Sequence, residues 1–140
     1  MKREDGLPPW FQSLLPLIRE ACERHHIKYL YVAGSLLRPD DFGPASDIDW
    51  IFDFERDNIS DSDFLDNLDA FWGKLEQITG RSADLIHYPS LHNPYFIADL
   101  DATKVLIYDL QSEQVSVLTL AEQHRRQQFH TGVKAIRLPQ

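Results

Sequence analysis

The apolar residues of this chain follow a helical period in two long stretches. From residue 13 to about residue 25 they recur every three or four positions, which predicts a helix capped by the Ser13 hydroxyl. A second stretch runs from residue 63 to about residue 78, and Gly80 predicts its end because glycine readily takes the left-handed conformation that closes a helix. The predicted buried faces are Leu14, Leu15, Leu17, Ile18, Ala21 and Cys22 in the first helix and Phe64, Leu68, Phe71, Trp72, Leu75 and Ile78 in the second.

Four shorter apolar stretches have the composition of β-strands. They cover residues 29–33, 47–54, 82–88 and 104–108. Between the last two, Asn93-Pro94 predicts a short helix, because asparagine caps a helix and proline suits its first position. Helices and strands in this order predict an α/β (α+β) domain in which a small mixed β-sheet is backed by helices.

The length of 140 residues fits one domain. Residues 1–13 are interpreted as a loose leader, residues 14–109 as the domain and residues 110–140 as a C-terminal extension. The extension holds a candidate strand at 115–118 and a polar helix from 119 to about 130. A helix this polar gains little from packing on its own domain. We therefore weigh two readings: a contact for a partner or for a second copy of this chain, and a solvated terminus.

Composition excludes several classes of protein. The formal net charge of −8 argues against DNA or RNA as a bulk partner, since proteins that bind phosphate backbones carry basic patches. The single cysteine, Cys22, leaves no internal disulfide. The N-terminus lacks the pattern of a signal peptide, and no stretch reaches the ~18 apolar residues of a membrane span. A cytoplasmic protein without membrane association is expected.

Small and acidic residues follow one another in an order that predicts a phosphate and metal site. Gly34-Ser35 ends the first predicted strand, and such a turn lets backbone N–H groups approach an anion closely. Asp47 and Asp49 then point to one side of the next strand, where they repel by ~4 kcal/mol at an effective dielectric near 20. A magnesium ion would offset this repulsion. Asp84 joins them if its strand lies beside theirs.

Each of these residues also has a purely structural reading. Asp47 and Asp49 could be solvated residues of an edge strand, Asp84 a strand-terminal acid and Arg38 a surface arginine. The preceding Gly34-Ser35 turn favours the functional reading of the acids. Asp53 shares the face of Asp47 and Asp49, but it lies nearer the strand end and is expected to be exposed.

Gly34-Ser35, Arg38 and Ser46-Asp47-Ile48-Asp49 resemble the signature of nucleotidyltransferases of the DNA polymerase β-like superfamily. The order of elements is similar to that of the minimal nucleotidyltransferases, antitoxin-type enzymes encoded beside HEPN toxins. Segments 83–86 and 93–108 resemble that family's third-carboxylate strand and terminal helix-strand, so the resemblance covers about residues 14–109. Eleven residues separate Ser35 from Asp47 where the family usually has ten, which predicts a bulge in the loop.

The resemblance implies a nucleotidyltransferase fold and a metal-dependent transfer of AMP from ATP. Asp47, Asp49 and Asp84 would be the catalytic residues and the ligands of Mg²⁺ or Mn²⁺. Asp84 would also help deprotonate an acceptor hydroxyl, which attacks the α-phosphate as pyrophosphate leaves. The nucleoside triphosphate would be bound by Gly34, Ser35 and Arg38.

The acceptor is the open question. About thirty residues follow Asp109, fewer than a second helical domain needs, so acceptor recognition by another protein is expected. The resemblance implies that this partner is a HEPN-type toxin whose tyrosine hydroxyl receives AMP. Two alternatives stay open: a non-catalytic antitoxin-like binding module, and a small-molecule nucleotidyltransferase with a partner subunit.

Overall fold

The computed structural model describes residues 6–55 and 59–110. The chain divides into two compact units, residues 1–108 and 109–140, and the second unit is described only at Asp109 and Leu110. The strand expected at 115–118 and the helix expected at 119–130 lie outside the described residues. In the described part of the chain, no helix is long and apolar enough to cross a membrane.

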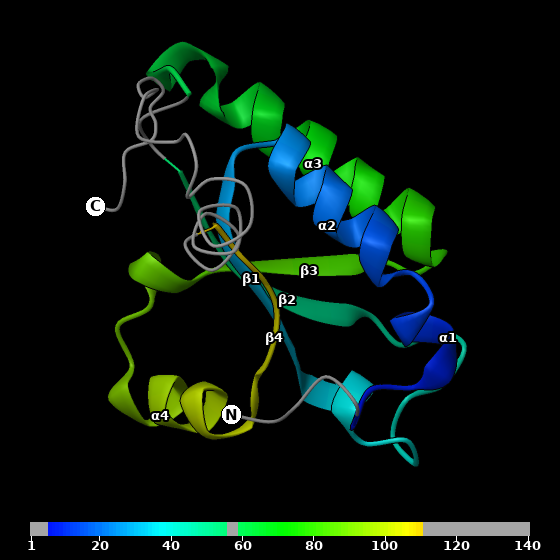
Figure 1. The fold of residues 1–140 in the computed structure, drawn as a ribbon. Coiled ribbons are helices and arrows are strands. Elements are labelled where there is room, and N and C mark those ends of the chain that lie inside the picture. Colours follow the sequence, from blue (N-terminus) through cyan, green and yellow to red (C-terminus); the bar gives the residue numbers. More distant parts are fainter. Residues whose placement is uncertain (1–5, 56–58, 111–140) are drawn as a thin grey trace, which may run out of the picture. The chain divides into compact units, whose positions relative to one another are not determined.

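A four-stranded sheet forms the centre of the first unit (Figure 1). Its strands are β1 (Ile27–Ala33), β2 (Ile48–Phe54), β3 (Ala83–His87) and β4 (Val105–Asp109), in the order β3-β2-β1-β4. Strand β2 is antiparallel to β1 and parallel to β3. The mixed sheet and its four predicted strands are therefore confirmed.

Helices cover both faces of this sheet. Helices α2 (Leu15–Arg24) and α3 (Phe64–Thr79) lie side by side over one face, and α4 (Pro94–Thr103) lies over the other (Figure 1). The strand period places Trp50 on the first face and Ile51 on the second, and both are fully buried. Because both faces are covered, β2 is nearly all apolar, and the few polar residues on it stand out.

The predicted ends of the later helices agree with the structure. Gly80 closes α3 with a φ of +70°. The Asn93 side chain accepts hydrogen bonds from the N–H groups of Tyr95 and Phe96 at the start of α4. Short 3-10 turns, η2 (Gly34–Leu37), η4 (Asp61–Asp63) and η5 (Tyr88–Ser90), follow β1, precede α3 and follow β3.

The first predicted helix was wrong in two details. Ser13 is not its cap: helix α2 follows Leu14, and the Ser13 hydroxyl donates to the carbonyl of Trp10. Leu17 is 51% exposed, because at 100° per residue it lies on the far side of α2 from the buried residues Leu15 and Cys22. In α3, Trp72 is 36% exposed rather than buried, with its indole directed to β3.

The loose leader expected at residues 1–13 is also corrected for its described part. Residues Pro9–Gln12 form a helical turn, α1. Leu7 and Phe11 are buried, and the Phe11 ring lies 5.8 Å from that of Trp50. These apolar side chains pack this segment on the core. The Pro8-Pro9 pair had favoured the prediction of a loose segment instead.

Candidate functional site

The sheet register brings two of the predicted acids together. Asp49, near the start of β2, is paired with Ala33 on β1 and with Asp84 on β3. Residues paired directly across strands point to the same face, so Asp49 and Asp84 are side by side. Asp47 lies immediately before β2, two residues from Asp49. The three acids therefore gather where β2 and β3 begin and β1 ends.

Gly34 is in direct contact with this acidic group. It follows β1 with a φ of +75°, a conformation that side chains rarely adopt. A Cβ atom at this position would overlap the Asp49 Oδ2 atom. Glycine is thus required here both by the backbone and by the approach of the carboxylate. Gly34 and Asp49, 15 residues apart in sequence, therefore belong to one site.

The acids at this site are electrostatically strained. Burial raises the pKa of Asp49 above its usual value, and the negative charges of Asp84 and Asp47 raise that pKa further. Arg38 acts in the opposite direction. None of the three acids has a hydrogen-bond donor among residues 6–55 and 59–110. The fold therefore assembles negative charge here and leaves it largely uncompensated.

Arg38 is close to the acids but bonded elsewhere. Its Nε atom donates to Asp41 Oδ2 at 2.8 Å, and both side chains are more than half exposed. The Arg38 N–H also donates to the Ser35 carbonyl, which closes the turn η2. An exposed ion pair of this kind is weak, so Arg38 can exchange Asp41 for another anion at little cost.

The loop between Ser35 and Asp47 is held by Arg81, which no sequence pattern singled out. Arg81 donates to the Gly43 carbonyl at 2.6 Å, and its guanidinium lies 4.6 Å from the centre of the Phe42 ring. Gly43 and Ser46 exchange two hydrogen bonds, N–H to Oγ and N–H to carbonyl. This turn delivers the chain to Asp47. Since Arg81 lies two residues before β3, it also ties the turn before Asp47 to the strand that carries Asp84.

Asp53 was expected to be exposed, and this is wrong. Its side chain is 15% exposed and accepts hydrogen bonds from the Phe54 N–H at 2.8 Å and from His87 Nε2 at 3.0 Å. An ionised carboxylate only accepts, so the histidine nitrogen is the donor. The parallel partner strand brings His87 to this end of β2, which could not be known before the strand order was.

The three acids fit a divalent cation by chemistry. Hard carboxylate oxygens are the ligands magnesium prefers. In the described ranges, no three His, Cys, Asp or Glu side chains are already arranged to hold a metal ion. Asp47 and Asp84 are exposed and free to turn, whereas Asp49 is half-buried against Gly34. Asp49 would be the fixed ligand, and the two others would turn toward it.

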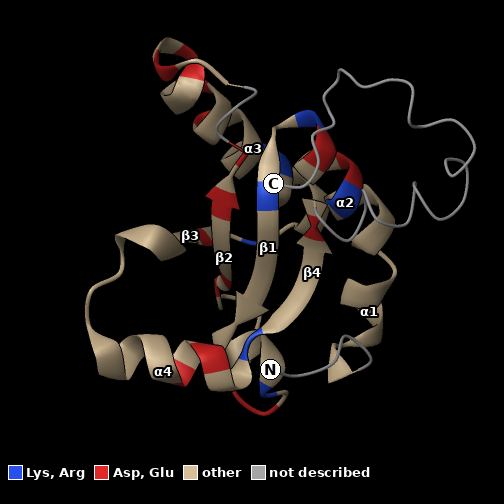
Figure 2. Ribbon diagram, turned by 60° about the vertical axis from the view of Figure 1, so that its left-hand side comes forward, with Lys and Arg blue, Asp and Glu red and all other residues tan. Residues whose placement is uncertain are grey.

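Acid content alone does not mark this site. Figure 2 shows acidic positions on α2, α3 and α4 as well as on the strands. What distinguishes the site is the register that places carboxylates against each other and against a glycine.

Comparison with known families assigns the domain that carries this arrangement. The nucleotidyltransferase domain family matches residues 15–107. The chain belongs to this family. The matched range contains the turn at Gly34-Ser35 and all three acids of the nucleotidyltransferase domain described above. No protein of curated function matches the chain.

Solved structures share the nucleotidyltransferase fold. A toxin–antitoxin crystal structure with AMP-PNP is 16% identical, with a TM-score of 0.50, over 79% of this chain and 87% of that chain. A tri-AMPylated Shewanella oneidensis HEPN toxin in complex with MNT antitoxin is 15% identical, with a TM-score of 0.46, over 81% of this chain and 86% of that chain. At 16% identity the likeness to the first of these structures is one of fold.

Proposed function

We propose that this nucleotidyltransferase domain transfers AMP from ATP to a hydroxyl group of a partner protein, a HEPN-type toxin, and so acts as an antitoxin. The observation that carries the proposal is the position of Asp49, which lies against Gly34 and is paired with Asp84. A structural acid would be expected to have a donor. This one instead has two like charges near it, which raise its pKa.

The proposed roles follow from exposure and position. Asp47, Asp49 and Asp84 would hold Mg²⁺ or Mn²⁺, and the bound cation supplies positive charge for the triphosphate. Ser35 and the backbone N–H groups of its turn would donate to phosphate oxygens, and Arg38 would leave Asp41 to do the same.

Asp84 is suited to accept the proton of the acceptor hydroxyl, because it is exposed at the start of β3. The acceptor oxygen forms a bond to the α-phosphorus as the bond to the bridging oxygen breaks. The proton passes to Asp84, and pyrophosphate leaves.

The proposed identities of the nucleotide and of the partner are less directly supported than the assignment as a nucleotidyltransferase. The family assignment supports nucleotidyl transfer. The choice of ATP is supported by fold likeness to a toxin–antitoxin structure with AMP-PNP. The choice of a toxin as the partner is supported by that likeness. The HEPN type of the toxin and the acceptor residue on it follow from the motif resemblance alone.

Position-specific labelling of ATP tests the proposal. The chain is incubated with a HEPN-type partner, Mg²⁺ and ATP labelled either at the α- or at the γ-phosphate. Transfer of AMP puts the α-label on the partner and leaves the γ-label in pyrophosphate. Label from γ-ATP on the partner would indicate a kinase. Neutralisation of the partner by Asp49→Asn to the same extent as by the natural chain would indicate a binding module without catalysis.

A further inference from the structure

Strand β3 is an edge of the sheet, so one side of its backbone faces away from β2. The Ile48 N–H donates to the Ser82 carbonyl at 2.9 Å, which directs the polar groups of residue 82 toward β2. In a parallel pair, successive residues alternate between the two sides. The N–H and carbonyl of Ala83 therefore point to the outer edge, where residues 6–55 and 59–110 provide no strand to pair with them.

Two side chains of α3 form hydrogen bonds with these outward-facing backbone groups instead. The Ala83 N–H donates to Glu76 Oε2 at 2.8 Å. The Trp72 indole N–H donates to the Ala83 carbonyl at 3.0 Å. Trp72 and Glu76 are four residues apart and so project from the same side of α3. Together they bond both backbone groups of one residue, and that residue directly precedes Asp84.

We propose that Trp72 and Glu76 are positioning residues for Asp84. Asp84 is exposed, and its carboxylate has no hydrogen-bond partner in the described part of the chain, so only the backbone fixes the point from which this side chain projects. Ala83 is the first residue of β3, where a strand end frays most easily. The two bonds from α3 hold this end in the register that places Asp84 beside Asp49.

The catalytic consequence of this clamp rests on the proposed function, whereas its structural consequence does not. If the start of β3 frays, Asp84 spends much of the time away from its position beside Asp49. Its loss affects the proton transfer more than nucleotide binding, since Gly34, Ser35 and Asp49 lie on other elements. At saturating Mg²⁺, weakening the clamp should therefore lower kcat by a larger factor than it raises KM for ATP.

The test compares Glu76→Met, which removes the acceptor, with Glu76→Gln, which keeps an acceptor oxygen on a side chain of the same size. Gln77→Met, at the exposed neighbouring position, controls for the methionine. We expect Glu76→Met to speed hydrogen exchange of the Ala83 amide about tenfold and to lower kcat by a similar factor, the equivalent of one lost hydrogen bond. Glu76→Gln and Gln77→Met should stay within about twofold of the natural chain by the same measure.

Two results would overturn the proposal. One is unchanged Ala83 exchange in Glu76→Met. The other is an equal loss of kcat in Glu76→Gln and Glu76→Met, which would indicate the charge of Glu76 rather than its bond to Ala83. If Glu76→Met does not fold, Trp72→Phe decides by the same measurements, because it keeps an aromatic ring at this position and removes the indole N–H that bonds the Ala83 carbonyl.

Failure of the proposed function is distinguishable from failure of the clamp. If the natural chain transfers no nucleotide, kcat is undefined, but the exchange rate of Ala83 still reports the clamp. A Mg²⁺ titration followed at the Asp84 amide then replaces kinetics. Glu76→Met should need a higher Mg²⁺ concentration than Glu76→Gln for half of the chemical shift change, and equal midpoints would contradict the positioning role.

Discussion

The two ends of β2 hold acids on the same face and treat them in opposite ways. At the end near Gly34, Asp49 is packed against a glycine, and its burial, together with the charges of Asp84 and Asp47, raises its pKa. At the other end, Asp53 accepts hydrogen bonds from His87 and from a backbone N–H. The bonds at Asp53 stabilise the fold. The uncompensated charge at Asp49 is typical of a site that binds a cation.

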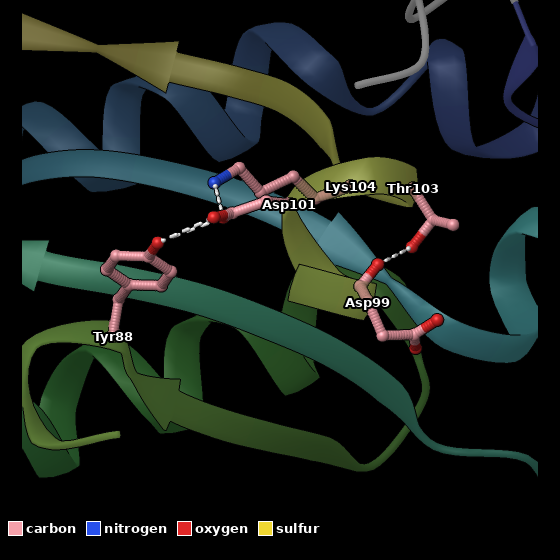
Figure 3. A network of polar contacts seen from close by, with 5 residues as sticks. All are labelled: Tyr88, Asp99, Asp101, Thr103 and Lys104. Atoms are coloured by element: carbon pink, nitrogen blue, oxygen red, sulfur yellow. Dashed lines mark hydrogen bonds and ion pairs between the residues drawn. The ribbon is translucent and has the colours of Figure 1, made fainter. Parts of the chain in front are cut away.

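A second acid away from the site shows the same contrast. Asp101 on α4 accepts from Lys104 Nζ at 2.6 Å and from the Tyr88 hydroxyl at 2.9 Å (Figure 3). The bond from Lys104 is the main cause that lowers the pKa of Asp101. Lys104 also lies 4.5 Å from the centre of the Tyr31 ring. This fold can supply partners for its acids, so their lack at Asp49 is informative.

The largest effect is expected from comparing Asp49→Asn with Asp53→Asn. Asp49→Asn should lower nucleotidyl transfer by about 10²- to 10³-fold, the range seen when one preorganised electrostatic group is removed. Asp53→Asn should keep most of the activity but lower the melting temperature, because His87 loses a charged acceptor. Equal losses of activity in the two variants would remove the distinction between the ends of β2.

A glycine pair sharpens the same comparison. Gly34→Ala places a Cβ against Asp49 Oδ2 and forces a residue with a side chain into positive φ, at about 1–2 kcal/mol of stability. Transfer should fall at least tenfold as Asp49 is displaced, in line with about 1.4 kcal/mol per factor of ten. Gly43→Ala meets nothing within 4 Å and should change neither quantity. Activity assays and thermal melts of the two variants, side by side, check this.

The local elements of this fold were accessible from the sequence. The period of two in β2 and the caps at Gly80 and Asn93 are properties of neighbouring residues, and they predicted the strands and helix ends correctly. The Leu17 and Trp72 errors arose where a helix is amphipathic but its orientation toward the sheet was unknown. The burial of Phe11 depends on contact with Trp50, 39 residues away, which no local pattern encodes.

The candidate site was partly accessible for the same reason. The motif order named Gly34, Asp49 and Asp84, but their proximity depends on the strand order β3-β2-β1. The parts that sequence could not provide are bonds between side chains and distant backbone groups. Arg81 to the Gly43 carbonyl and Glu76 to the Ala83 N–H are such bonds, and backbone partners leave no trace in residue identity.

A smaller effect is expected away from the site. Lys104→Met removes the ammonium from Asp101 and from the rings of Tyr31 and Tyr88. Lys104 is 14% exposed, so the loss should be about 1 kcal/mol of unfolding free energy, at the upper end for exposed ion pairs and cation–π contacts. Denaturant unfolding measures it. The rate of transfer should stay within about twofold, which corresponds to a change of less than about 0.5 kcal/mol in the activation free energy.

The smallest effect is on the pH dependence of the free energy of unfolding, to which Asp49 and Asp101 should contribute with opposite signs. The raised pKa of Asp49 means that its ionised form opposes folding. Asp49→Asn should thus stabilise the chain at neutral pH, and the gain should vanish as pH falls from the raised pKa to the ordinary value of 3.8.

Asp101 should behave in the reverse way. Its lowered pKa means that its ionised form favours folding, above the ordinary value of 3.8. Asp101→Asn should destabilise the chain at neutral pH, and this loss should vanish as pH falls through the lowered pKa. Urea unfolding of both variants and the natural chain across this range gives the two slopes, and slopes of the same sign would contradict the assigned electrostatics.

Calorimetric titration of the full chain with ATP tests the central claim most directly, once with Mg²⁺ and once with a chelator. The account predicts binding with Mg²⁺ that is lost in chelator and in Asp49→Asn, because the acids at Gly34 need a cation before they accept a triphosphate. Equal ATP affinity with and without Mg²⁺ would contradict it, since the triphosphate would then be bound by something other than the three acids.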